Sequence, residues 1–205
     1  MLASAMLPPR QSLRALLAAK QRTKFDTVMA RFGLPPAAFD RFEPWYGAIA
    51  LVGLELQKTG YSGTNGIEET LSAAARAKGK PRIGLETAAQ QLAMFHGLPL
   101  AVQKKYLGEV LDDLPKVGEE LDEMVREWSA GHAEKLAELV NSDQDDPHMV
   151  ATLITNRNKA WAGWIGQRLD RPGTVFVAVG AGHLAGKDSV QTFLSRRGVT
   201  VTRVQ

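Results

Sequence analysis

A single histidine follows the most apolar extended stretch of this 205-residue chain. Residues 174–179 are apolar or β-branched, which predicts a strand buried on both faces. The stretch ends in a turn that carries Gly180, Gly182 and His183. The carboxyl end of a buried strand is where open α/β sheets bind ligands, and glycines permit the positive φ and close approach that such a turn needs. The imidazole would bind a metal or act as a general base; the alternative is that His183 only packs or caps.

Two glutamates lie just before or at the start of predicted helices. Glu86 ends a short apolar stretch, residues 82–86, that predicts a second strand. Parallel strands would place Glu86 and His183 at one edge of a sheet, where a carboxylate serves as a metal ligand or general base. The alternative is that Glu86 complements the dipole of the following helix. Glu68 has the same two interpretations, and the structural one is stronger there because Asn65 and Glu68 form a capping-box pattern.

One arginine lies on the apolar face of a long predicted helix. That face carries Val150, Leu153, Ile154, Trp161, Trp164 and Ile165, and it includes Arg157 with Asn158 one step away. A guanidinium facing a core cannot lose its charge, so it should meet a carboxylate or a bound anion. Arg157 and Asn158 would therefore hold an anionic or carbonyl group of a ligand. The alternative is a buried salt bridge from Arg157 to Glu86 or Glu68.

The glycines near His183 do not form a nucleotide site. The spacing of Gly180, Gly182 and Gly186 is one residue longer than the dinucleotide fingerprint, and no further βαβ unit follows it. The run from Gly182 to Lys187 is one residue short of a P-loop, and Asp188 stands where a P-loop has Ser or Thr. Both nucleotide interpretations are excluded.

The elements that must position these residues are mostly helical. Strands are expected at residues 82–86, 174–179 and 199–204, with many helices between and around them. Helices are expected at residues 11–31, 37–42, 45–57, 67–78, 87–95, 100–112, 116–129, 131–140, 147–169 and 188–196. The predicted fold class is α/β, a helix-rich α+β arrangement with a small mixed or parallel sheet. Three strands make a thin sheet, which suggests further strands upstream of Met1 or from a partner chain.

Composition limits the class of protein. The length suits one domain over residues 1–205, and 25 basic and 22 acidic residues are interspersed, so no nucleic-acid-binding surface is expected. No cysteine is present, which excludes disulfides and thiolate metal sites. No apolar run has the length of a membrane span or of a signal peptide. A periplasmic or envelope location is expected if a signal peptide precedes this chain, and a cytoplasmic one otherwise.

Several motifs, taken in order, resemble the TraB/GumN (PrgY-like) family, which is related to the Tiki metalloproteases. The resemblance begins near residue 10 and rests on the most specific motif, residues 177–186, together with Arg157-Asn158. The other matching motifs are Glu43-Pro44-Trp45, Gly66-Ile67-Glu68, Gly84-Leu85-Glu86-Thr87, Trp128-x-x-Gly131 and Gly198-Val199-Thr200-Val201.

The resemblance implies an α/β domain whose site uses two G-x-x-H motifs and acidic residues. In the Tiki branch that site supports peptide cleavage dependent on a divalent metal, with Mn, Co or Zn as the expected ions. Gly180 and His183 correspond to the family's C-terminal G-x-x-H, and Glu86 to its leucine-glutamate motif. This sequence contains no second G-x-x-H. The resemblance therefore implies a chain that begins downstream of the first strands and holds half of a metal site.

Two functions follow from these observations. The first is a metal-dependent, peptidase-like hydrolase in which His183 and Glu86 are metal ligands and Glu86, Arg157 and Asn158 are catalytic. The second is a non-catalytic module that binds a peptide or partner, with His183 and Arg157 in a buried polar network. A peptide or small-molecule ligand and a homo-oligomer fit either function.

Overall fold

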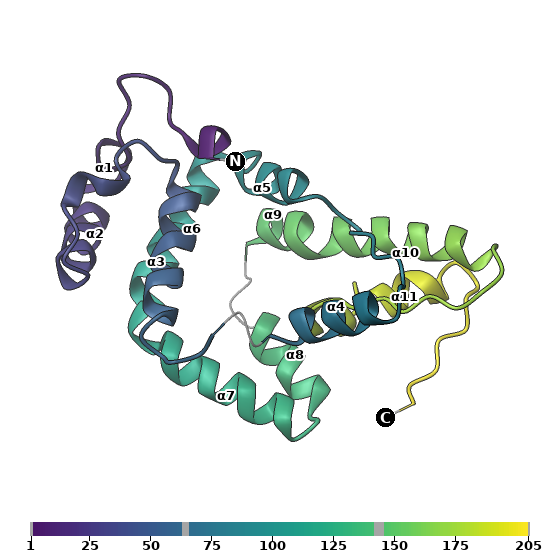
Figure 1. Ribbon diagram of the computed structural model, residues 1–205. Helices are drawn as coiled ribbons and strands as arrows, with labels where there is room; N and C mark the ends of the chain where they lie inside the picture. The colour runs from purple at the N-terminus through teal and green to yellow at the C-terminus, as the bar shows by residue number, and fades with distance from the viewer. Residues whose placement is uncertain (1, 63–65, 142–145, 205) are drawn as a thin grey trace. The chain divides into compact units, whose positions relative to one another are not determined.

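The computed structural model describes residues 2–62, 66–141 and 146–204, and these residues form helices joined by turns and extended segments (Figure 1). No residue within these ranges belongs to a β-strand. The one β-type pairing recorded there is an isolated antiparallel bridge between Met6 and Phe42. The expected α/β class with a small sheet is therefore wrong, because the described part of the chain is all-helical.

The three expected strands have no strand partners among the described residues: residues 174–179 and 199–204 carry no regular secondary structure, and Leu85 and Glu86 form a bend. Their apolar side chains point largely to solvent: Ile83 is 71% exposed, Phe176 78% and Val204 91%. β-Branched residues favour an extended backbone locally, but a strand exists only where a second segment accepts its hydrogen bonds. No backbone hydrogen bond between described residues pairs any of the three with a second strand.

Contacts along the chain divide it into two compact units, Met1–Glu119 and Glu120–Gln205, and each is described by itself. The helices of the first unit pack around an apolar centre that includes Leu13, Phe25, Met29, Leu51 and Leu107. The elements of this unit are η1 (Leu2–Ala5), α1 (Leu13–Leu16), α2 (Ala19–Arg31), η2 (Pro36–Phe39), α3 (Pro44–Leu56), α4 (Ile67–Ala77), α5 (Ala88–His96), α6 (Leu100–Asp113) and η4 (Leu114–Lys116).

The most extensive helix packing in the first unit is between α3 and α6. Pro44 occupies the first position of α3, as expected from its fixed φ. A Cβ at Gly47 would lie 3.2 Å from Leu13 Cδ2, so a glycine lets α1 approach α3 closely. At the start of α5, Thr87 and Gln90 form the expected capping box. The expected cap Asn65 lies outside the described residues, and the residue preceding α4 is Gly66, without a side-chain cap.

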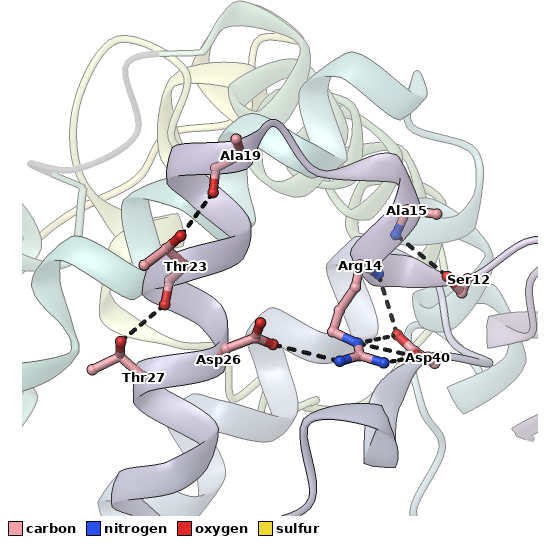
Figure 2. Close-up of polar contacts among 8 residues, drawn as sticks. All are labelled: Ser12, Arg14, Ala15, Ala19, Thr23, Asp26, Thr27 and Asp40. Carbon is pink, nitrogen blue, oxygen red and sulfur yellow. Dashed lines mark hydrogen bonds and ion pairs between the residues drawn. The ribbon is translucent and has the colours of Figure 1, made fainter.

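A partly buried ion pair joins Arg14 of α1 to Asp40 in the loop before α3 (Figure 2). Arg14 Nε donates to Asp40 Oδ1 at 3.0 Å, and Arg14 Nη2 donates to Asp40 Oδ2 at 2.8 Å. Asp26 of α2 lies 3.9 Å from Arg14 Nη1 on the other side of the guanidinium. The hydrogen bond from Arg14 holds the pKa of Asp40 below its ordinary value. This network fixes three segments of the first unit.

The second unit is built around one long, interrupted helix. α9 (Pro147–Val150), the π-helical segment η5 (Ala151–Thr155) and α10 (Asn156–Leu169) follow one another without a break, close to the expected range 147–169. Asp146 caps this helix as expected, because its carboxylate accepts from the backbone N–H of His148 at 2.9 Å. The other elements are α7 (Val117–Ser129), which begins in the first unit, α8 (Ala133–Asn141), η6 (Ala181–Leu184) and α11 (Val190–Ser195).

None of the helices in the described ranges combines the length and apolar character that a bilayer span requires.

Candidate functional site

The π-helical segment sets the position of Arg157 and Asn158. Its wider turn is closed by a hydrogen bond from the Asn156 N–H to the Ala151 carbonyl, five residues back. Such segments leave carbonyls without their usual helical partner and are frequent at functional sites. Here Arg157 Nη1 donates to the Leu153 carbonyl at 3.0 Å. The π-helical segment therefore holds the Arg157 guanidinium against its own helix, beside the Leu153 carbonyl.

Asn158 is fully buried and orients the imidazole of His183. Its Nδ2 donates to the Asp188 carbonyl at 2.7 Å, which fixes the amide so that Oδ1 points to His183 Nδ1 at 2.7 Å. An amide oxygen only accepts, so Nδ1 must carry the proton. In the neutral ring, Nε2 then holds the lone pair. The sequence predicted Arg157, Asn158 and His183 as site residues, and the structure brings these three together.

The remaining face of His183 meets a cation and an indole. Arg157 Nη1 lies 3.3 Å from His183 Nε2, so the guanidinium donates to the ring nitrogen. The guanidinium carbon stands 4.8 Å from the centroid of Trp161, and the His183 and Trp161 ring centroids are 4.6 Å apart. Trp161 is 6% exposed, and its buried Nε1 has no hydrogen-bond partner among the described residues. Arg157, His183 and Trp161 form one contiguous group, hereafter the Arg157–His183 site.

The glycine turn approaches α8 too closely for any side chain. A Cβ at Gly182 would lie 2.8 Å from Val140 Cγ1 and 3.1 Å from Asn141 Oδ1, and Asn141 Nδ2 donates to the Gly182 carbonyl at 3.2 Å. Close backbone approach was expected of this turn. Positive φ was also expected, but neither Gly180 nor Gly182 has it; Gly186 does, at +78°.

Four residues of the site were missed by sequence reasoning. Trp161 was expected among the apolar residues of the helix face, and it is buried, but its contacts with Arg157 and His183 were not expected. Thr155 donates to Asp188 Oδ2 at 3.1 Å and ties the π segment to the loop before α11. Asn141 and Asp188 gave no sequence signal, because the Asn141 amide donates to the Gly182 carbonyl and the Asp188 carbonyl accepts from Asn158 only once tertiary folding brings them near.

Comparison with known proteins identifies the family. The sequence profile of the TraB/PrgY/gumN family matches residues 1–203. The chain belongs to the TraB/PrgY/gumN family. It is 28% identical over 192 residues to "Uncharacterized protein YbaP" of Escherichia coli (strain K12), which covers 93% of this chain and 70% of that protein. The same figures hold for "Uncharacterized protein YbaP" of Shigella flexneri. No solved structure matches the chain significantly.

The glutamates expected at a shared TraB/PrgY/gumN site belong to the first unit, whereas the Arg157–His183 site belongs to the second. Glu86 lies in the turn before α5, where its Oε2 accepts from Gln91 Nε2 at 3.2 Å. Glu68 lies in the exposed first turn of α4, where its charge favours the helix dipole. No sheet edge in the described residues links either glutamate to His183. The metal-ligand and catalytic roles expected for Glu86 remain predictions.

The side chains around His183 do not by themselves fit a divalent metal. No group of three or more His, Asp or Glu side chains in the described residues is placed to hold one. His183 has one feature of a metal ligand, because the Asn158 oxygen accepts from its Nδ1–H and leaves the Nε2 lone pair pointing away from Asn158. That Nε2 faces a guanidinium at 3.3 Å, however, and a cation there opposes a second cation. A metal centre would need Arg157 to move and further ligands to join.

A second polar cluster falls on the family motif Glu43-Pro44-Trp45. Glu43 precedes α3, and its carboxylate accepts from Trp45 Nε1 at 2.6 Å and lies 3.0 Å from His96 Nδ1. Trp45 stacks on Phe95, with ring centroids 5.5 Å apart. His96 and Phe95 end α5, so the motif fastens α5 to the start of α3.

Proposed function

We propose that the second unit is a binding module that takes a carboxylate of a peptide or small molecule at the Arg157–His183 site. The observation that carries this proposal is the combination of an organised imidazole and a half-buried guanidinium stacked on one indole. A guanidinium matches a carboxylate in shape and charge, and the face of Trp161 helps to orient it.

The chemistry of binding would use the existing contacts. Arg157 Nη1 now donates to His183 Nε2 and to the Leu153 carbonyl. An incoming carboxylate would accept from the guanidinium in place of the imidazole. His183 would then hold a proton on both nitrogens or accept from the ligand, while Asn158 keeps its Nδ1–H in place. Binding at this site requires no covalent step, and none is proposed.

Binding is tested by NMR titration with N-acetyl-alanine and, separately, its amide. The carboxylate is expected to bind in the millimolar range and to shift the resonances of His183 and Trp161, whereas the amide binds at least tenfold more weakly. Arg157→Ala should abolish the difference between the two probes. Arg168→Ala is the matched control, because Arg168 lies on the same helix but donates to the Arg171 carbonyl. Equal affinity for acid and amide would overturn the proposal.

A metal-dependent, peptidase-like hydrolase is the second candidate, and the orientation of His183 Nε2 favours it. The chain's membership of the TraB/PrgY/gumN family is compatible with this candidate, but the relatives reported above are uncharacterised and add no evidence for a metal. The test is calorimetric titration with Mn, Co and Zn salts. Binding that is lost in His183→Ala and kept in His132→Ala would support a metal at His183; His132 is an exposed histidine of the same unit, paired with Glu127. Metal binding that is equal in the two variants, or absent, would remove this candidate.

A further inference from the structure

A cluster of positive charge lies at the end of α4 and in the segment that follows it. Four basic residues fall within seven positions there, and each of them is exposed: Arg76, Lys78, Lys80 and Arg82. No Asp or Glu occurs from residue 70 to residue 85, so no neighbour in sequence balances them. None of the four side chains forms an ion pair or a hydrogen bond with a described residue. These residues, hereafter the basic segment, leave four cationic side chains open to an external anionic partner.

The end of α4 divides the basic segment into a helical and a non-helical part. Gly79 has a positive φ of +60°, and the backbone N–H of Lys80 donates to the Ala75 carbonyl at 2.9 Å, as in a Schellman cap. The chain leaves the helix at this point, and residues 80–84 have no regular secondary structure. A helix dipole favours cations in the last turn, which accounts for the first two basic residues. It does not account for Lys80 and Arg82, which lie beyond the end of the helix.

Aliphatic side chains accompany the basic segment. Ile83 follows Arg82 directly and is 71% exposed. No side chain of α4 is buried, and Ile67, which is 50% exposed, shares a helical face with Leu71. Residues 66–94 contain no Phe, Tyr or Trp, so they lack the side chains that stack on the bases of single-stranded nucleic acids. Cations beside exposed aliphatic side chains instead match a surface of anionic headgroups over hydrocarbon.

We propose that the basic segment binds the surface of an anionic lipid bilayer, with its cations among the headgroups and Ile83 in the outer hydrocarbon. Charge complementarity supplies the attraction, because basic side chains near an anionic leaflet are drawn to it. The exposed aliphatic side chain distinguishes a bilayer from a polyanion that offers charge alone. The protein would lie on the membrane without spanning it. This proposal does not depend on carboxylate binding at the Arg157–His183 site.

The attachment is expected to be reversible and sensitive to salt. Each Lys or Arg close to an anionic surface raises the affinity about fivefold at low ionic strength. Raising the salt concentration from about 0.1 M to about 1 M shortens the Debye length from about 10 Å to about 3 Å, so binding should weaken roughly tenfold or more. One exposed isoleucine cannot by itself hold the protein on a neutral bilayer, and vesicles without anionic lipid should therefore bind it about tenfold more weakly or less.

Co-sedimentation of the whole chain with lipid vesicles tests the attachment. The vesicles contain phosphatidylserine and phosphatidylcholine in equal parts, or phosphatidylcholine alone. Lys80→Gln combined with Arg82→Gln should weaken binding to the anionic vesicles roughly 25-fold, about fivefold for each charge removed. The control is Lys20→Gln combined with Arg22→Gln, at two exposed positions of α2. It removes the same charge elsewhere in the first unit and should change binding less than about twofold.

Because the chain has no cysteine, a single labelled cysteine can report whether Ile83 enters the bilayer. An environment-sensitive dye attached to Ile83→Cys should shift its emission to shorter wavelengths on the anionic vesicles. The same dye attached to Ala30→Cys, at an exposed position of α2, should not shift.

Four results would overturn the proposal. Three concern the vesicles: equal binding to the two kinds of vesicle, an equal loss of binding in the two double variants, or no shift of the dye at residue 83. The fourth is tighter binding of the wild-type chain to single-stranded RNA than to the anionic vesicles, which would make a nucleic acid the partner of the basic segment.

Discussion

The two units differ in what occupies their centres. Among the largest fully buried side chains in the described residues, those of the first unit are apolar, with Phe25 and Trp45 the biggest; the second unit contributes one, Asn158. The first unit also places its arginine–carboxylate pair, Arg14 and Asp40, at the edge of the core. An apolar centre is stabilised by burial and close packing, whereas a buried amide also requires specific hydrogen-bond partners. The second unit is therefore the one organised around a polar group.

The first variant concerns the apolar centre. Phe25→Ala should lower the free energy of unfolding by about 3–5 kcal/mol, because it removes a large ring from a packed core and leaves a cavity. Hydrogen exchange followed by mass spectrometry should show the loss of protection mainly in α2, α3 and α6. Loss of protection centred on α10 instead would contradict the assignment of Phe25 to the first unit's core.

The second variant concerns the polar centre. Asn158→Ala should cost about 2–3 kcal/mol, because the Nδ1–H of His183 and the carbonyl of Asp188 both lose a buried partner. Denaturant unfolding measures the loss. Asn156→Ala, two residues earlier on the helix at an exposed position, is the control and should cost far less. Similar values for the two variants would show that the second unit does not depend on its buried amide.

The third variant concerns the turn that carries His183. Gly182→Ala should cost about 1–2 kcal/mol, because the new methyl group would overlap Val140 and force α8 or the turn to shift. Gly186→Ala should destabilise the protein for a different reason: the new methyl group meets no neighbouring atom, but the backbone there has a positive φ that alanine rarely adopts. The resonances of His183 distinguish the two: they should move in Gly182→Ala and remain nearly unchanged in Gly186→Ala. Unchanged resonances in Gly182→Ala would mean that the turn does not position the imidazole.

The smallest effect should come from the ion pair of the first unit. The pKa of Asp40 is lowered in the folded state, so its contribution to stability is present above its ordinary pKa and is lost as the pH falls through the folded value. The stability difference between the wild type and Asp40→Asn should be constant from about pH 5 to 7, because this range lies above the ordinary aspartate pKa of about 4. The difference should shrink in more acidic solution. A difference that grows on acidification would contradict this sign. Urea unfolding at several pH values measures it.

The helices could be predicted because their signals are local. Thr87 with Gln90, Pro44 and Asp146 mark helix starts within a few residues of sequence, and the observed starts agree. The strands could not, since a strand is defined by its partner and residues 82–86 and 174–179 have none in the described part of the chain. The sequence likewise showed that Arg157 faces inward, but not that it would meet an imidazole. That contact depends on how η6 packs beside α10, which no local pattern encodes.

Asn158 holds His183 as the Nδ1–H tautomer with Nε2 toward Arg157. NMR of the ¹⁵N-labelled imidazoles at neutral pH tests this tautomer directly, because the two ring nitrogens of each histidine differ in shift according to which one carries the proton. We expect a protonated Nδ1 and an unprotonated Nε2 at His183, with the preference lost in Asn158→Ala. An Nε2–H tautomer in the wild type, or the same tautomer in both proteins, would contradict it.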